Sequence, residues 1–401
     1  MPATSRFAAR FRIGRGQPAH RALEPRLLAA IREAVAAELG EHDPADVRVT
    51  VSWIQTREKS RLAALWAEAG NASRELILKQ LNVAADGVPI SGAGDQRRRK
   101  RPHLAVPGAF GERFRREYAS LRAIEDALER APVPGLRPIH PIAYLGDHRA
   151  LVMERFPGTS LRRSLSASLG RVRPPGGRST NGRMVRAAVR HAGAWLRTFH
   201  RSDPTPSEGE GRGGPTRHAT VSELSVAARE LCTFLAEYVG PPAYFDSLCS
   251  ELQARMEASL PATLPLGRMH GDFAPRNVLV APDGAVAVLD IDGWTRGPIY
   301  EDIAYFGVNL RTSLPVAIAQ GFTQDRRARD LVEHTFVEAY FESAAPPWAA
   351  LHIFDVLVML DKWCGRPPRP PRVPGGRAMS MVGRSLVDRF FRAEIERILA
   401  E

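Results

Sequence analysis

Apolar and polar residues alternate along the first quarter of the chain in a way that predicts three strands. The alternation is clearest over Val47–Trp53, and runs of strand character follow at Arg61–Trp66 and Glu75–Leu81. A period of two residues is typical of strands that bury one face. The turn-rich segment Glu68–Ser73 separates the last two, so three antiparallel strands in sequence are the simplest arrangement. The periodicity then stops, and residues 83–110 are expected to form a loop with a basic tract.

A helix and two more strands are predicted next. Apolar residues recur every three or four positions over residues 114–128, which is the spacing of one helical stripe, and Pro132 closes this helix. Residues 141–145 and 149–156 have strand character on either side of a Gly-Asp turn. The segment FPGTSL then leads away from this sheet-rich lobe, so a boundary is expected near residue 157.

The rest of the chain is expected to be mainly helical, with one β-hairpin. Helical spacing covers residues 184–200, 221–238, 244–260, 331–342, 348–363 and 380–399. The hairpin is predicted from two short apolar runs, Val278–Val280 and Val286–Leu289, which flank the turn residues Pro-Asp-Gly. The sequence therefore predicts an α+β protein with a sheet-rich lobe at 46–156 and a helical lobe at 157–401, after an N-terminal extension and helix at 1–45.

Composition indicates an ordinary globular protein. The 401 residues are 44% hydrophobic and 25% charged, which excludes disorder of the whole chain. The sequence has neither a secretory signal nor a run of about 18 apolar residues, so no membrane insertion is expected. The three cysteines, Cys232, Cys249 and Cys364, lack the spacing of a disulfide framework or a thiolate metal site, and a reducing cytoplasm is the expected compartment.

One motif carries candidate chemistry. The segment HGDFAPRNVLV contains His270, Asp272 and Asn277 in the pattern H-x-D-x-x-x-x-N, directly before the predicted hairpin. Asp290 follows at the end of the second hairpin strand, so both strand ends return an oxygen ligand to one place. This pattern favours phosphoryl transfer, because that reaction depends on positioning a hydroxyl, a phosphoryl group and Mg²⁺. The alternative is structural, with Asp and Asn capping a turn and Asp290 and Asp292 as exposed carboxylates.

Each residue of the motif has an expected role. Asp272 is expected to orient or deprotonate the acceptor hydroxyl, and His270 to brace the loop. Asn277 and Asp290 offer hard oxygen ligands suited to Mg²⁺, with Asp292 as the substitute ligand. The sequence thus predicts a catalytic group and a metal site on the same hairpin.

Two charged residues in apolar surroundings indicate a nucleotide site in the first lobe. Lys79 lies inside an apolar strand on the face of Ile77 and Leu81, and Glu117 lies on the apolar stripe of the following helix. Each charge needs a partner there. The two explain each other as the lysine–glutamate pair of a kinase, whose ammonium group contacts the α/β-phosphates. The alternative for Lys79 is a side chain that reaches solvent at a sheet edge.

These residues resemble those of the aminoglycoside phosphotransferase and choline kinase-like family. The family's H-G-D-x-x-x-x-N loop and following aspartate appear here as HGDFAPRN and VLDID. REY at 116–118 is similar to its helix glutamate, and AWLRTFH, which ends at His200, to its L-x-x-L-H helix. Asp302 is similar to the aspartate that secures the family's catalytic region from behind. The resemblance implies a two-lobed protein-kinase-like fold and the use of ATP and Mg²⁺.

The resemblance also implies nucleotide contacts in the first lobe. LVMERFPGTSL is similar to the family's inter-lobe hinge, so adenine is expected to contact backbone groups of Glu154–Phe156, next to Met153. The segment IQTREKSRLAA, between the first two strands, departs from the family because it has no glycine. Its backbone amides, or the side chains of Arg57, Lys59 and Ser60, are expected to approach the phosphates instead.

The basic character of the chain keeps two other functions open. Lys and Arg outnumber Asp and Glu by 56 to 44, a net charge of +12, and the tract RRRKR at 97–101 is typical of phosphate-binding surfaces. A nucleic-acid-binding protein is one alternative, but no aromatic residues interleave the tract, so no specific nucleic acid is expected as a partner. The other is a catalytically inactive kinase fold that acts as an interaction module. No obligate protein partner is expected.

The acceptor is expected to be a small hydroxylated molecule that is neutral or anionic. The second lobe would supply both the catalytic hairpin, at 270–292, and the helices that bind the acceptor. From Phe341 to Glu401 the chain has nine Lys plus Arg and seven Asp plus Glu, and Arg276 and Arg296 add positive charge near the motif. Polycationic acceptors need a predominantly acidic site, which this segment does not offer.

Overall fold

The structure is a computed structural model in which the chain forms two compact units. The described residues are 23–40, 43–56, 60–81, 102, 104, 112–169, 182–202, 215–291, 293, 295–365 and 376–401. Unit 1 holds the described residues up to 81 with 112–125 and 139–156, and unit 2 holds 102, 104, 126–138 and those from 157 onward. Arg57, Lys59, Asp292 and the predicted loop 83–110, apart from Pro102 and Leu104, lie outside the described residues.

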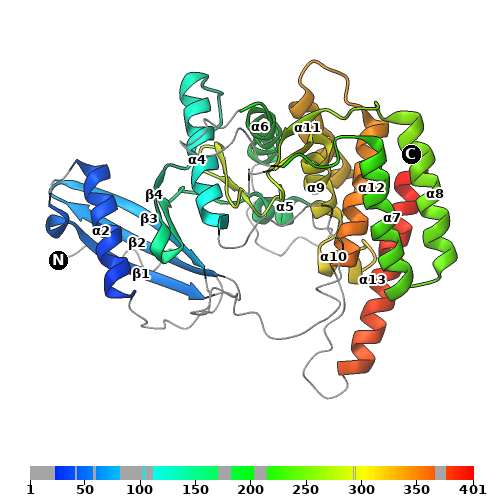
Figure 1. Ribbon diagram of the computed structural model, residues 1–401, viewed down its shortest axis with the longest axis horizontal. Coiled ribbons are helices and arrows are strands. Elements are labelled where there is room, and N and C mark those ends of the chain that lie inside the picture. The colour runs from blue at the N-terminus through cyan, green and yellow to red at the C-terminus, as the bar shows by residue number, and fades with distance from the viewer. Residues whose placement is uncertain are drawn as a thin grey trace. The chain divides into compact units, whose positions relative to one another are not determined.

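Unit 1 is built on a five-stranded antiparallel sheet with the order β1-β2-β3-β5-β4 (Figure 1). Its strands are β1 (Arg48–Thr56), β2 (Ser60–Ala69), β3 (Ala72–Leu81), β4 (Pro141–Leu145) and β5 (Ala150–Glu154). The predicted antiparallel pairing of the first three strands is confirmed. Lys79 of β3 pairs in register with Leu62 of β2 and Leu151 of β5, so it lies on a central strand.

The turn between β2 and β3 is shorter than the sequence predicts. Ala69 pairs with Ala72, so the strands take up most of the predicted turn segment, Glu68–Ser73. Gly70 has a φ of 55°, which lies in the left-handed region that tight two-residue hairpins require. One glycine in this conformation therefore replaces a longer loop.

Helix α2 (Pro25–Leu39) covers one face of this sheet (Figure 1). It begins at a proline, which suits the first helical turn, and it ends at Gly40, whose φ of 75° is left-handed. The side chains of Leu27, Ile31 and Val35, spaced one turn apart, are buried against alternate residues of the strands. This contact forms the hydrophobic core of unit 1.

Unit 2 is mainly helical, which confirms the α+β class predicted for the chain. Its described helices are α5 (Leu161–Leu169), α6 (Gly182–Arg201), α7 (Val221–Tyr238), α8 (Pro242–Ser259), α9 (Ile299–Arg311), α10 (Leu314–Ile318), α11 (Arg326–Phe341), α12 (Trp348–Cys364) and α13 (Gly376–Leu399). The six helices predicted from apolar spacing correspond to α6, α7, α8, α11, α12 and α13. Helix α9 was not predicted because almost all its residues are buried, so it has no polar face to produce a periodic pattern.

Two small sheets interrupt the helices of unit 2. The predicted hairpin consists of β8 (Val278–Val280) and β9 (Val286–Val288), and β6 (Thr159–Ser160) pairs with β8. A second pair, β7 (Leu266–Arg268) and β10 (Arg296–Pro298), was not predicted, because three-residue strands are too short to show alternation. These two sheets bracket the motif in sequence.

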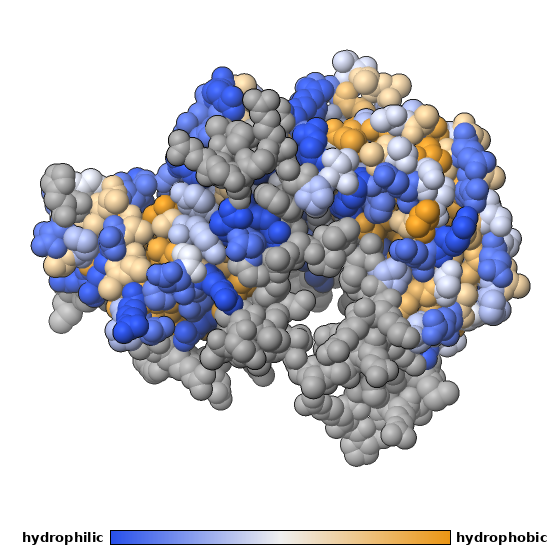
Figure 2. Space-filling model, viewed as in Figure 1, coloured by the Kyte–Doolittle hydropathy of each residue, from blue (hydrophilic) through white to orange (hydrophobic). Residues whose placement is uncertain are grey.

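Hydrophilic and hydrophobic residues are interspersed over the surface of unit 2 that Figure 2 shows. Large apolar side chains lie inside, where Trp195, Phe273, Phe306 and Phe336 are almost completely buried. None of the described helices combines the length and the apolar character needed to cross a membrane.

Candidate active site

The motif predicted to be catalytic forms the loop between β7 and β8 in unit 2, and Asp302 holds its backbone. Asp302 lies in the first turn of α9 and is fully buried. Its Oδ2 accepts the His270 N–H at 2.5 Å, and its Oδ1 accepts the Gly271 N–H at 2.9 Å. Gly271 has a φ of 79°, a left-handed conformation that favours glycine. A single buried carboxylate thus fixes two consecutive peptide groups of the loop.

Buried polar groups hold Asp302 in turn. His200, near the end of α6, places Nε2 3.2 Å from Asp302 Oδ2, and its Nδ1 lies 2.8 Å from the hydroxyl oxygen of Tyr340. Burial by itself would raise the pKa of Asp302, but the hydrogen bond from His200 and the N–H of His270 outweigh that effect and hold the pKa below its usual value. Asp302 is therefore an ionised acceptor at neutral pH.

His270 connects the loop to the end of β9 in its neutral form. Its Nε2 lies 3.2 Å from the carbonyl oxygen of Leu289, to which a ring nitrogen must donate. Its Nδ1 lies 3.3 Å from the backbone nitrogen of Asp272, from which it accepts. Burial lowers the pKa of His270, against the attraction of nearby aspartates. One ring nitrogen that donates and one that accepts define a neutral imidazole.

Phe273 anchors the loop in the aromatic core of unit 2. Its ring centroid lies 6.0 Å from that of Trp195 on α6, 6.0 Å from that of Phe306 on α9 and 5.8 Å from that of Phe336 on α11. Aromatic pairs at such separations add to the stability gained from burial. Because Phe273 directly follows Asp272, this contact with three helices limits movement of the Asp272 backbone.

Asp272 itself stays accessible, with 43% of its side chain exposed. Its Oδ2 accepts a hydrogen bond from the guanidinium of Arg276, four residues later. Its backbone carbonyl accepts the side-chain amide of Asn277 at 2.9 Å. An exposed ion pair contributes at most about 1 kcal/mol, so Arg276 orients the carboxylate without closing it off.

Asn277 pairs through its backbone with Leu289, the residue before Asp290, across the hairpin. The Leu289 N–H donates to the carbonyl oxygen of Asn277 at 2.9 Å, and Asp290 is the next residue. The side-chain nitrogen of Asn277 is already bonded to the loop, so its side-chain oxygen is the atom suited to a cation. Asp290 has a φ of 60°, which residues other than glycine rarely adopt.

This donor set fits Mg²⁺. The ion prefers oxygen ligands, takes one or two from side chains and completes its shell with waters and substrate phosphates. Among the described residues, no three His, Cys, Asp or Glu side chains gather as a metal cluster. One amide oxygen and one carboxylate match a site that is completed by a nucleotide, and the substitute ligand Asp292 lies outside the described residues.

In unit 1, Lys79 and Glu117 form a buried ion pair. Lys79 Nζ lies 2.5 Å from Glu117 Oε1, and the two side chains are 7% and 1% exposed. Glu117 belongs to α4 (Arg113–Arg130), on the sheet face opposite α2, as the alternation of side chains along β3 requires. The predicted pairing is confirmed, and the alternative in which Lys79 reaches solvent at a sheet edge is wrong. Contact of this pair with a nucleotide stays a prediction.

Two N–H groups of the predicted adenine-binding segment are already used in hydrogen bonds within unit 1. The N–H groups of Glu154 and Arg155 donate to backbone carbonyls within unit 1, both at 2.8 Å. Contact of this segment with adenine stays a prediction. Met153 is buried on β5, and Ser60 is the first residue of β2.

A buried ion pair beside Asp302, which the sequence does not predict, joins Arg217 to Glu301. Arg217 Nη2 lies 2.8 Å from Glu301 Oε1. Arg217 also donates a hydrogen bond to the backbone carbonyl of Leu104. The backbone N–H of Leu104 donates in turn to Asp361 at 3.3 Å. Burial raises the pKa of Glu301 to about 7, against the attraction of Arg217. The only sequence signal was a pair of acidic residues, Glu301 and Asp302, in an otherwise apolar segment.

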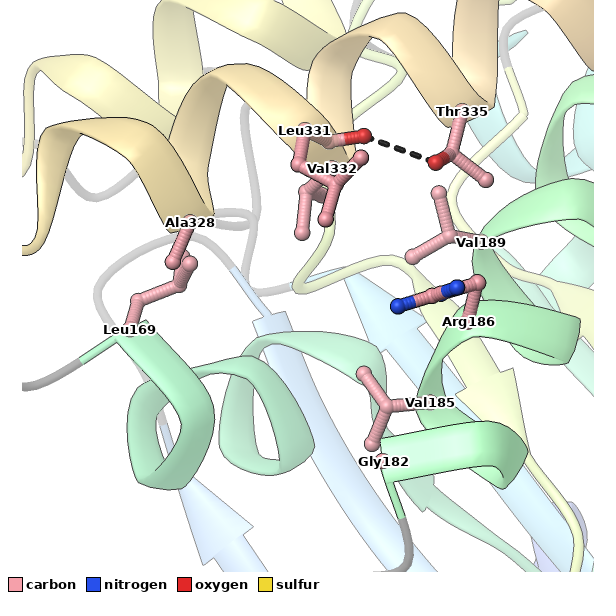
Figure 3. A pocket seen from close by; sticks show the side chains of 9 residues that line it. All are labelled: Leu169, Gly182, Val185, Arg186, Val189, Ala328, Leu331, Val332 and Thr335. Carbon is pink, nitrogen blue, oxygen red and sulfur yellow. Dashed lines mark hydrogen bonds between the residues drawn. The ribbon is translucent and has the colours of Figure 1, made fainter.

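A pocket in unit 2 has no part in this site. Its lining residues are Leu169, Gly182, Val185, Arg186, Val189, Ala328, Leu331, Val332 and Thr335 (Figure 3). Its volume of about 130 Å³ is below the roughly 300 Å³ at which ligand sites usually begin. The lining is mostly aliphatic, and the Thr335 hydroxyl donates to Leu331 of its own helix at 2.7 Å (Figure 3). It lacks the acidic groups that phosphoryl transfer needs.

Several solved structures are similar to the chain at low identity. A choline/ethanolamine kinase family protein from Mesorhizobium loti is 16% identical, with 92% of this chain and 97% of that chain covered and a TM-score of 0.46. A glucosamine kinase is 16% identical, with 88% and 94% covered and a TM-score of 0.49. A macrolide 2′-phosphotransferase from Brachybacterium faecium is 14% identical, with 92% and 98% covered and a TM-score of 0.45.

The family comparison covers most of unit 2 and part of unit 1. No curated protein gives a significant match. Residues 68–337, two thirds of the chain, match the phosphotransferase enzyme family APH. This range begins in β2 and includes the Lys79–Glu117 pair, the loop from His270 and the Asp302 that holds it. The match confirms the resemblance found in the motif, and the chain belongs to the phosphotransferase enzyme family.

Proposed function

We propose that this protein is an ATP-dependent phosphotransferase that moves the γ-phosphoryl group to a hydroxyl of a small molecule. The observation that carries the proposal is the loop held by Asp302, in which an accessible Asp272 lies next to a hairpin whose backbone joins Asn277 to Leu289, the residue before Asp290. This arrangement supplies a proton acceptor and two oxygen ligands from one rigid segment. We place the reaction in the cytoplasm, where the three cysteines would stay reduced.

Asp272 accepts the proton of the acceptor hydroxyl as that oxygen bonds to the γ-phosphorus. The bond between the γ-phosphorus and the β–γ bridging oxygen breaks, and ADP leaves with its electron pair. When bound, Mg²⁺ neutralises charge on the phosphate oxygens. Asn277 and Asp290 would hold the ion, and neutral His270 and ionised Asp302 keep the loop in place throughout.

Unit 1 would bind the nucleotide. Lys79, oriented by Glu117, contacts the α/β-phosphates, and the backbone of Glu154–Phe156 beside Met153 contacts adenine. Ser60, where the glycine-free segment enters β2, approaches the phosphates. The buried position of the Lys79–Glu117 pair supports this role, because desolvation strengthens the interaction of a fixed ammonium group with phosphate.

A screen of small hydroxylated metabolites for acceptor-dependent ADP formation tests the proposal. With any acceptor found, Asp272→Asn should lower kcat by 10² to 10⁴, as expected for a lost acid–base group, and leave ATP binding nearly unchanged. Asp283→Asn is the matched control, because Asp283 is an exposed aspartate in the turn of the same hairpin. If Asp272→Asn keeps more than about half of wild-type turnover, the assignment of Asp272 is wrong.

The same experiment separates the two alternative functions. ATP binding without transfer to any acceptor would favour a catalytically inactive interaction module. Salt-sensitive RNA binding without ATP binding would favour a nucleic-acid-binding protein. The tract at 97–101 on which that alternative rests lies outside the described residues.

A further inference from the structure

Two cationic side chains share one acceptor beside Asp272. Arg276 Nη1 and Lys362 Nζ each donate to Oδ1 of Asn309, both at 3.1 Å. The two nitrogens are therefore no farther apart than twice that distance, 6.2 Å. The other terminal nitrogen of Arg276 donates to the Asp272 carboxylate. All these residues belong to unit 2.

The position of the shared amide is fixed by the helices beneath it. Asn309 on α9 donates its side-chain N–H to the carbonyl of Tyr305 at 2.7 Å, so its oxygen must face the two cations. Lys362 on α12 lies over the Tyr305 ring, with Nζ 5.0 Å from the centroid. The Tyr305 hydroxyl donates to the buried Asp361 at 3.1 Å. Two packed helices thus hold the cluster formed by Arg276, Asn309 and Lys362.

This cluster has the chemistry of an oxyanion site. Two positive charges lie within 6.2 Å of each other, so an anion that contacts both side chains is attracted by both. Arg276 offers a planar fork of N–H donors and Lys362 a compact point charge, a combination that suits carboxylate and phosphate oxygens. The side chain of Arg276 is 42% exposed, so a ligand can reach it.

We propose that Arg276, Asn309 and Lys362 form a subsite for an oxyanionic group, a carboxylate or phosphate, on the acceptor. This inference rests on the proposed function and gives it a substrate class. The guanidinium group of Arg276 contacts both the subsite and the Asp272 carboxylate. An acceptor whose anionic group binds the subsite can therefore place a hydroxyl next to Asp272. The subsite therefore selects acceptors by charge and positions them for transfer.

Binding of inorganic phosphate in the absence of nucleotide is the first test, and it needs no turnover. Titration calorimetry should show phosphate affinity at least five-fold weaker for Lys362→Met than for the wild type, with affinity restored by Lys362→Arg. Arg137→Met is the matched control, because it removes a cation from an exposed ion pair with Asp283 elsewhere in unit 2. Equal phosphate affinity in wild type and Lys362→Met, or equal weakening by Arg137→Met, would overturn the proposal.

Steady-state kinetics then determine which oxyanion the subsite binds, an anionic group of the acceptor or the γ-phosphoryl group of ATP. Matched acceptors that differ by one anionic group, glucose and glucose 6-phosphate or glycerol and glycerate, are compared in wild type and Lys362→Met. We expect KM for the anionic partner to rise about ten-fold in the variant, with KM for the neutral partner and for ATP unchanged. A fall in kcat that is equal for both acceptors would assign Lys362 to the transferred phosphoryl group and refute an acceptor subsite.

The two proposals fail in different ways. Transfer confined to neutral or cationic acceptors would leave the phosphotransferase function intact and refute the anionic subsite. Absence of ATP binding and of transfer to every acceptor would refute the function. The phosphate titrations of Lys362→Met would then still decide whether the cluster binds anions.

Discussion

Asp290 is the residue where backbone conformation and proposed chemistry meet. Its φ of 60° lies in the left-handed region, which costs a residue other than glycine on the order of 1 kcal/mol or more. The hydrogen bond between Leu289 and Asn277, immediately before it, holds the chain in this shape. Aspartate is among the few residues other than glycine that adopt this conformation, so the backbone at Asp290 is compatible with the role of metal ligand that we propose.

Replacement of Asp290 should separate this function from the strain. Asp290→Ala and Asp290→Gly should both lose the Mg²⁺-dependent part of ATP binding, because both lack the ligand oxygen. Asp290→Gly should unfold at higher urea concentration than Asp290→Ala, since glycine accepts the left-handed backbone at lower cost. ATP titrations with and without Mg²⁺ measure the first effect. Unchanged Mg²⁺ dependence of ATP binding in both variants would show that Asp290 is not a metal ligand, and Asp292 would be the next residue to test.

His270 gives a prediction about pH. Its folded-state pKa lies below the usual 6.5 because of burial, so below pH 6.5 the unfolded chain takes up a proton that the folded chain does not. The stabilisation from neutral His270 is therefore complete above pH 6.5 and declines as the pH falls toward the folded pKa. The stability difference between wild type and His270→Asn, measured by urea unfolding, should be larger at pH 8 than at pH 5.5. A difference that stays constant or grows on acidification would contradict a neutral, buried imidazole.

The residues that carry the site differ in how far sequence could identify them. The spacing of His270, Asp272 and Asn277 predicts that they share one short loop, and they do lie between β7 and β8. The residues that hold Asp302 were not predictable from spacing. His200 and Tyr340 are 140 positions apart in sequence and come into contact only in the folded chain. The resemblance pointed to Asp302, but its two bonds to the loop backbone come from the structure alone.

At the scale of elements, the Lys79–Glu117 pair joins the central strand β3 to helix α4. Either charge alone would be buried without its counter-charge, which costs about 3 to 5 kcal/mol, whereas loss of both removes the unpaired charge as well. We therefore expect Lys79→Met and Glu117→Gln together to destabilise unit 1 much less than the sum of the single changes. Urea unfolding of the four proteins in a double-mutant cycle measures the coupling. Additivity within roughly 0.5 kcal/mol would remove the pair from the proposed site.

Several of the elements that the sequence predicts have one apolar and one polar face, although the buried helix α12 and the hairpin of β8 and β9 are predicted from continuous apolar runs. Helices α6 and α11 show this pattern, and strands β1 to β3 show its two-residue counterpart. Helix α9 lacks it because it is enclosed by other elements, and it also carries Asp302, Tyr305 and Asn309. Burial on nearly all sides, in a helix shorter than the similarly buried α12, thus concealed the helix that supports both the proposed catalytic loop and the proposed anion subsite.

For the molecule as a whole, the distribution of charge determines the acceptor that we expect. The net charge of +12 favours the approach of anions over cations. The acidic residues of α12 do not offset this near Asp272, because Asp355 is paired with Arg311 at 3.0 Å and Asp361 accepts hydrogen bonds from Tyr305 and Leu104. Both carboxylates are buried and bonded to residues of unit 2, so they are not available to bind a cationic acceptor.

A polycationic aminoglycoside should therefore be a poor acceptor. Several ammonium groups would have to be desolvated without matching carboxylates, next to Arg276 and Lys362. We expect kcat/KM for kanamycin below about 10⁴ M⁻¹s⁻¹, and a higher value for at least one neutral or anionic hydroxylated compound under the same conditions. Added salt should lower kcat/KM for an anionic acceptor, because it screens the attraction that steers the acceptor to a cationic surface. Efficient transfer to kanamycin that declines with salt would show that acidic groups, and not this cationic cluster, control access to Asp272.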